Sequence, residues 1–90
     1  MEKESVMWLV LVKLNNMGKF GGAHTALRNI ARGLPSSIAS NREGKRIIEK
    51  AIKELVNKGF LLAKSSTGEI HVSLNPKKVK EIREFIQKYR

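Results

Sequence analysis

The sequence has no cysteine and only two histidines, His24 and His71. Disulfide bonds, thiolate metal sites and a cysteine nucleophile are therefore excluded. Two histidines are too few for a structural zinc site unless carboxylates contribute. Either could contact a phosphate, but both are expected to be plain surface residues. No serine has histidine and acid partners at the spacing of a hydrolase triad. The residues thus indicate no catalytic group, no metal and no cofactor, and an enzyme is the least expected class.

Long apolar runs are also missing. The longest, from Val6 to Val12, is well short of the roughly 20 residues that a membrane-spanning helix needs. The chain starts Met-Glu-Lys-Glu, without the basic segment and cleavage site of a signal peptide. We therefore expect a cytoplasmic protein that does not enter a membrane.

Acidic residues are scarce: eight Asp and Glu stand against 18 Lys and Arg, which gives a net charge of +10 on 90 residues. A charge of this size favours polyanionic partners such as DNA, RNA or an acidic lipid surface. The length and the hydrophobic fraction of 41% indicate a single folded domain over residues 1–90.

The most informative stretch is Ser40 to Phe60, SNREGKRIIEKAIKELVNKGF. Ser40 and Glu43 have the S-x-x-E spacing of a capping box, which places a helix start here. An apolar stripe follows at helical spacing, formed by Ile48, Ile52 and Leu55. Gly59 stands where a left-handed C-terminal cap is common. These signals predict a helix over about 41–58.

The opposite side of this helix is basic. At about 100° per residue, the side chains pointing away from the apolar stripe are Arg42, Arg46, Lys50, Lys53 and Asn57. Glu49 lies at one edge of this face. A solvated helix surface with pairs such as Glu49–Lys53 would have the same appearance, so the face alone does not decide the function.

Two helices are expected before the basic one. The first, about 3–17, has Val6, Val10, Leu14 and Met17 at helical spacing, with further apolar residues beside them. The second, about 23–33, has an apolar face of Leu27, Ile30, Ala31 and Leu34 and ends at Gly33. The connector 34–39 has room for an extra helical turn, with Ile38 as its buried anchor.

Trp8 and Val12 project from the first helix away from its main stripe. They would form either a second contact surface or part of a core that surrounds the helix on most sides. Both interpretations stay open at the level of the sequence.

After the basic helix the apolar period changes from 3.6 to 2, which indicates a β-hairpin over about 60–74. The segment Ser65 to Gly68 is expected to close it through a type I turn with Gly68 in the left-handed region. Asn75 and Pro76 then form the start of a last helix, about 76–89, as its N-cap and first residue.

The order of helix, helix, basic helix, hairpin and helix resembles a winged helix-turn-helix domain. The carrying residues are Leu55-Val56-Asn57-Lys58-Gly59-Phe60-Leu61, followed by the hairpin through Leu74. The chain is most similar to small archaeal winged-helix proteins. The resemblance implies an α+β, mostly α fold with a three-helix core, a two-stranded β wing and a C-terminal helix.

The resemblance also implies how the chain would bind double-stranded DNA, as a transcriptional regulator. The third helix would enter the major groove, with arginines suited to guanine edges and lysines to phosphates. The wing tip would contact the backbone or minor groove, and the second helix would meet flanking phosphates. The expected DNA-binding residues are Arg42, Lys45, Arg46, Lys50, Lys53, Arg28, Arg32, Thr25, Lys64, Ser66 and Thr67.

RNA or ribosome binding and a protein–protein module are the alternative functions, because the charge does not separate DNA from RNA. We also expect a homodimer, since the first and last helices have more apolar surface than a three-helix core needs. The expected interface residues are Trp8, Val12, Ile82, Phe85, Ile86 and Tyr89.

Overall fold

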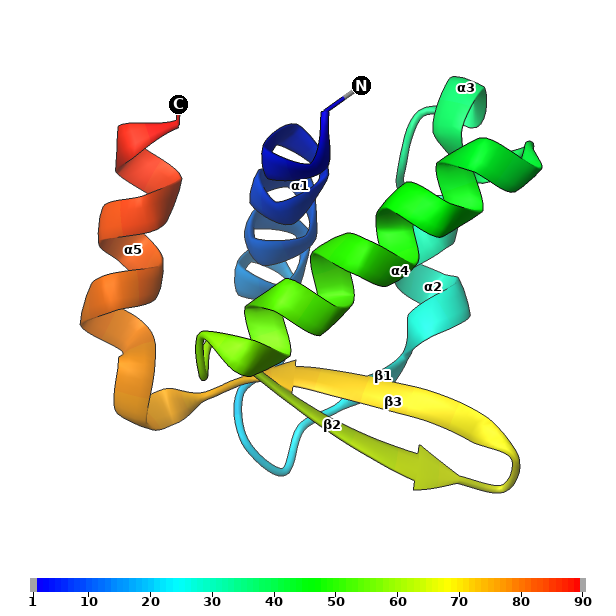
Figure 1. Cartoon of the computed structure of the whole chain (residues 1–90). Coiled ribbons are helices and arrows are strands. Elements are labelled where there is room, and N and C mark those ends of the chain that lie inside the picture. Colours follow the sequence, from blue (N-terminus) through cyan, green and yellow to red (C-terminus); the bar gives the residue numbers. More distant parts are fainter. Residues whose placement is uncertain (1, 90) are drawn as a thin grey trace.

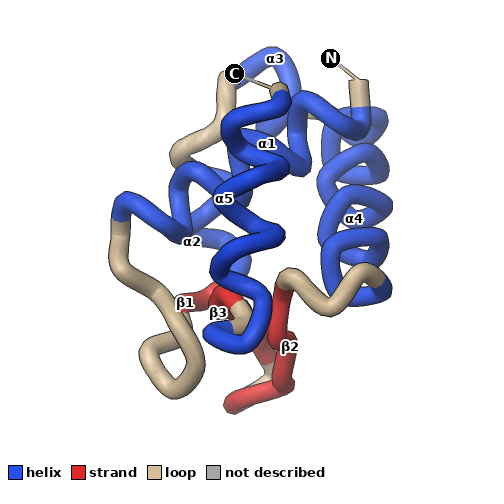
Figure 2. The backbone as a smooth tube through the Cα atoms, turned by 90° about the vertical axis from the view of Figure 1, so that its left-hand side faces the viewer, coloured by secondary structure: helices blue, strands red, loops and turns tan. Residues whose placement is uncertain are grey.

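The structure is a computed structural model and describes residues 2–89. It is an α+β fold that is mostly helical, with one small antiparallel sheet (Figure 1). Helix α1 stands between α4 and α5, and the sheet lies below these three helices. Figure 2 shows α5 in front of α1, with α4 to one side and the sheet at the lower end. No helix within residues 2–89 is both long enough and apolar enough to cross a bilayer.

Helix α1 (Lys3–Asn16) is the centre of the core. Five of its side chains are at most 1% exposed: Val6, Met7, Val10, Leu11 and Leu14. The predicted stripe is therefore confirmed except at Met17, which is 38% exposed. The helix ends before Met17, because Gly18 has a φ of +68° and the Lys19 amide donates to the Leu14 carbonyl.

Helix α2 (Leu27–Arg32) is shorter than the predicted 23–33. Thr25 and Ala26 are instead extended as strand β1 (Thr25–Ala26), which pairs with Val72 and His71 of β3. Pairing with β3 satisfies backbone groups of Thr25 and Ala26, and this stabilises the extended conformation over the helix that the apolar spacing predicts. The sheet has three strands in the order β1-β3-β2, which corrects the expected two-stranded wing.

Helix α3 (Ser36–Ala39) is the extra turn that the connector was expected to allow, and Ile38 is its buried anchor at 3% exposure. Helix α4 (Arg42–Asn57) follows at once. Its N-cap is Asn41, whose Oδ1 accepts from the Gly44 amide at 2.6 Å. The predicted Ser40 capping box is therefore wrong: the Ser40 hydroxyl donates to the Ser36 carbonyl and completes α3.

The predicted stop and stripe of α4 agree with the structure. Gly59 has a φ of +80°, and the Phe60 amide donates to the Leu55 carbonyl. The buried side of α4 consists of Gly44, Ile48, Ala51, Ile52 and Leu55. Val56, beside the predicted stripe, is 38% exposed.

Strands β2 (Leu61–Ser66) and β3 (Glu69–Leu74) form the hairpin, with Ser66 opposite Glu69. The loop has only two residues, Thr67 and Gly68, with φ of +50° and +79°. Two successive positive φ values are typical of a type I′ turn, whose twist matches the strands. The left-handed Gly68 is confirmed, but the expected four-residue type I loop is wrong.

The last segment starts as a 3-10 turn, η1 (Pro76–Lys78), and continues as α5 (Val79–Lys88). Asn75 is the expected N-cap: its Oδ1 accepts from the Lys77 amide, while its Nδ2 donates to the Gly59 carbonyl. This second bond ties the start of the last segment to the end of α4. Helix α5 then lies against α1 and buries Ile82.

Candidate nucleic-acid interface

Five cations of α4 are exposed to solvent: four on its outward side, Arg42, Arg46, Lys50 and Lys53, and Lys45 nearer the buried stripe. The buried stripe of α4 packs on α1, so the opposite side cannot fold back onto the core. These side chains therefore project from the molecule over about three turns of α4, the green diagonal helix in Figure 1.

The charges of this face are not neutralised by carboxylates of residues 2–89. Among residues 2–89, the carboxylates that form ion pairs are Glu54, Glu69 and Glu81, and their partners lie outside the basic face. The Glu49–Lys53 ion pair is not formed. Such a pair would have been expected if the basic face were only a solvated helix surface. The face thus retains a positive potential that an anionic partner could neutralise.

Helix α4 is held at both ends. At its start, the Asn41 side chain joins α3 to α4, because Nδ2 donates to the Ser37 carbonyl at 2.6 Å while Oδ1 caps Gly44. Near its end, Lys3 Nζ lies 2.6 Å from Glu54 Oε1. The hydrogen bond from Lys3 lowers the pKa of Glu54 and, reciprocally, raises the pKa of Lys3. Asn41 was missed in the sequence although Asn is as good an N-cap as Ser.

The predicted wing residues lie at the far end of the hairpin, away from α5 (Figure 1). Lys64, Ser65 and Thr67 are exposed, and Ser66 is half-buried. The Thr67 hydroxyl donates to the carbonyl of Ser66 at 2.7 Å, so its hydrogen-bond donor is already satisfied within the turn. The tip therefore offers one cation and a few hydroxyl groups to a partner.

The residues expected from the second helix differ in availability. Arg32 is exposed. Arg28 forms an ion pair with Glu69 of the hairpin, so binding a phosphate would require it to exchange partners. Thr25 is only 7% exposed and its Oγ1 accepts from Asn29 Nδ2, which makes the expected phosphate contact by Thr25 wrong.

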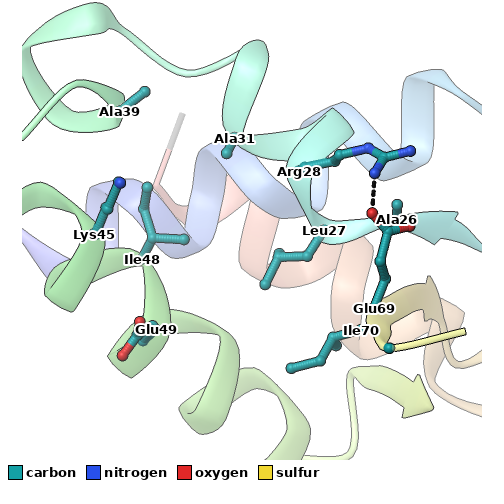
Figure 3. A pocket seen from close by; sticks show the side chains of 11 residues that line it. Ala26, Leu27, Arg28, Ala31, Ala39, Lys45, Ile48, Glu49, Glu69 and Ile70 are labelled. Atoms are coloured by element: carbon teal, nitrogen blue, oxygen red, sulfur yellow. Dashed lines mark hydrogen bonds and ion pairs between the residues drawn. The ribbon is translucent and has the colours of Figure 1, made fainter. Parts of the chain in front are cut away.

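A groove of about 420 Å³ lies between α2, α4 and the hairpin tip (Figure 3). Leu27, Ile48 and Ile70 form apolar walls, while Lys45 and Glu49 stand on the α4 side. Ile70 is 49% exposed although it shares a sheet face with Val72, because α4 and the hairpin diverge toward the hairpin tip. No sequence pattern brings these three segments together, so the groove was missed.

His24 and His71 also meet, contrary to the expectation of two separate surface histidines. Their Nδ1 atoms are 2.8 Å apart, and the rings are nearly perpendicular with centroids 4.8 Å apart. Partial burial lowers the pKa of His24, and the charges of Lys64, His71 and Lys19 lower it further. The two residues are far apart in the chain, and only the pairing of β1 with β3 aligns them.

The residues expected at a dimer interface are partly used inside the monomer. Ile82 is 1% exposed, so its assignment to an interface is wrong. Trp8 is half-buried against α5 and its Nε1 donates to the Ile86 carbonyl at 2.8 Å. Of the other four, Val12, Phe85 and Ile86 are half-buried and Tyr89 is 45% exposed. The open apolar surface is therefore smaller than the sequence suggested.

Comparison of the chain with models of known protein families, with curated proteins and with solved structures gave no match.

Proposed function

We propose that the chain is a double-stranded DNA-binding protein of the winged-helix type and a regulator of transcription. The observation that carries this proposal is the exposed, unneutralised basic face of α4 on a domain with a net charge of +10. Arg42, Arg46 and Lys50 would contact base edges or phosphates from within the major groove, which admits an α-helix.

The surroundings of α4 support the same mode of binding. A short helix precedes α4 across a tight turn, and a three-stranded sheet with a projecting hairpin follows it. Lys64 and Thr67 at the hairpin would contact the phosphate backbone or the minor groove beside the site of α4. Lys45 and Lys53 suit phosphates, because a flexible ammonium fixes position rather than sequence.

RNA is the competing polyanion, since the net charge alone suits both. The length and exposure of α4 favour DNA: the major groove of A-form RNA is too narrow for side chains to read. A competition between duplex DNA and structured RNA at the same salt concentration distinguishes the two. Preferential binding of RNA would exclude major-groove reading by α4.

A homodimer is part of the proposal, through the surface that Leu9 and Tyr89 leave open between α1 and α5. Two-fold symmetry would place two copies of α4 on the same side of a DNA duplex. Half-sites about one helical turn apart would then be expected.

The direct test compares two charge-matched double variants. Arg46→Ala/Lys50→Ala removes two cations from α4, whereas Lys80→Ala/Arg83→Ala removes two exposed cations from α5. We expect the first to lose most of its affinity for duplex DNA and the second to lose much less. Wild-type binding should also weaken steeply with salt, with a log–log slope of about −0.9 per phosphate contact. Equal losses in the two variants would show that α4 is not the interface.

A further inference from the structure

The His24–His71 pair lies away from α4. His71 belongs to β3 and alternates along the strand with Val72, which is buried in the core, so it points to the outer face of the sheet. His24 comes from the loop before β1 and closes over that face. The pair is therefore separate from α4, although Lys64 of the proposed wing contact lies beside it.

The contact joins the Nδ1 atoms of the two rings. A neutral imidazole has one N–H donor and one acceptor nitrogen. With Nδ1 facing Nδ1 at 2.8 Å, the contact needs a proton on one Nδ1, or a cation between two unprotonated ones. The Oε2 atom of Glu69 lies 3.9 Å from His71 Nε2 and favours a proton on that nitrogen. The Nδ1 atom of a neutral His71 is then unprotonated.

The spacing fits a shared metal ion. Two imidazole nitrogens bound at about 2.0–2.1 Å to one ion stand roughly 2.8–3.4 Å apart for angles between square-planar and tetrahedral. The observed 2.8 Å lies at the lower end of that range. A carboxylate behind a ligating imidazole, as Glu69 lies behind His71, is the usual outer support of such a ligand.

We propose that His24 and His71 bind a divalent transition-metal ion such as Cu²⁺, Ni²⁺ or Zn²⁺ through both Nδ1 atoms. Within residues 2–89 no third His, Asp or Glu joins them as a ligand, so water completes the coordination shell. A cavity of about 150 Å³ beside His24, lined also by Lys64 and Ser73, gives room for this water.

The local charges set the strength of the site. Lys64, which pairs with His71 across the strands, and Lys19 oppose a bound cation, while Glu69 favours it. A site with two nitrogen ligands should follow the Irving–Williams order, with Cu²⁺ bound most tightly.

The test is a calorimetric titration of the full chain, without an affinity tag and after chelator treatment, with each metal chloride. The chain has no cysteine and no other histidine, so few competing ligands exist. We expect one ion per chain, and at least tenfold weaker binding in His24→Gln and in His71→Gln. Wild-type affinity in both variants, or no binding by the wild type at millimolar metal, would overturn the proposal.

A second pair of variants separates a ligand role from a purely structural one. Glu69→Gln and Arg28→Gln break the same ion pair, but only the first removes the carboxylate behind His71. We expect Glu69→Gln to weaken metal binding about tenfold and Arg28→Gln to leave it unchanged. Equal effects of the two would contradict a supporting role of Glu69 and, with it, this site.

Discussion

The α-carbon of Gly44 lies directly against the backbone carbonyl of Ile38, so that a Cβ on Gly44 would overlap the carbonyl oxygen. This close approach allows α3 to pack on the first turn of α4. Gly44→Ala should therefore destabilise the fold, because the overpacking exceeds the gain in helix propensity. We expect a net loss of about 1–3 kcal/mol in the free energy of unfolding, measured by urea denaturation.

The control for Gly44→Ala is Gly22→Ala, since nothing lies within 4 Å of a Cβ at Gly22 and its φ is not in the left-handed region. This variant should unfold at nearly the wild-type urea concentration. A Gly44→Ala variant as stable as Gly22→Ala would mean that α3 and α4 can separate without cost.

Thr67 adopts a φ of +50°, which is unfavourable for a β-branched residue. Thr67→Asn should raise the free energy of unfolding by up to about 1 kcal/mol, because Asn tolerates the left-handed region and Asn-Gly favours a type I′ turn. Thermal denaturation followed by circular dichroism measures the change. Ser65→Asn, at an extended strand position, should give no such gain, and a loss of stability in Thr67→Asn would argue against this turn.

The lowered pKa of His24 predicts how stability depends on pH. Below its ordinary pKa of 6.5, the unfolded chain binds a proton at His24 that the folded chain binds only at lower pH. The free energy of unfolding should therefore fall as pH is lowered from 6.5 through the folded-state pKa. Urea unfolding above pH 5, with chelator present, should show a steeper fall in the wild type than in His24→Gln. Parallel curves would refute this assignment.

Glu49 lies at one edge of the basic side of α4, and it is exposed. Under the proposed function, Glu49→Gln should tighten binding to duplex DNA about two- to fivefold at low salt, by removing repulsion of the phosphates. Fluorescence anisotropy measures this gain. Glu84→Gln on α5 makes the same change in net charge and should have a smaller effect; the reverse order would place the DNA elsewhere.

Tyr89 and Leu9 border a cavity of about 260 Å³ between α1 and α5, with Trp8 and Ser5. If this surface joins two copies, Tyr89→Glu should shift the chain to monomer in sedimentation experiments at high micromolar concentration, because it places a charge in an apolar contact. Lys88→Glu, on the neighbouring exposed position, should change the distribution less. A monomeric wild type at that concentration would exclude the dimer.

Much of the local structure followed from short-range patterns in the sequence. The apolar stripe of α4, the left-handed Gly59 and the Asn75 cap each depend on residues within a few positions of one another. The exposure of Arg42, Arg46 and Lys50 followed as well, since the opposite side of an amphipathic helix must be buried.

The errors arose where distant segments compete for the same backbone or side chain. Thr25 has a helical pattern yet pairs with β3. The N-cap error was local instead: Asn41 caps α4, while the Ser40 hydroxyl donates to the Ser36 carbonyl. Trp8 and Ile82 were assigned to a surface, but α1 and α5 pack together and use them within the monomer.

The sequence by itself thus determined the positions of α1, α4, the hairpin and the last helix, the strong positive charge and the side of α4 on which that charge lies, because each depends on composition or on the period of a single element. Only the tertiary structure decided that Arg28 meets Glu69, that His24 meets His71 and that a groove lies beside α4. Such contacts join segments far apart in the chain, and they depend on packing and strand pairing that no local pattern encodes.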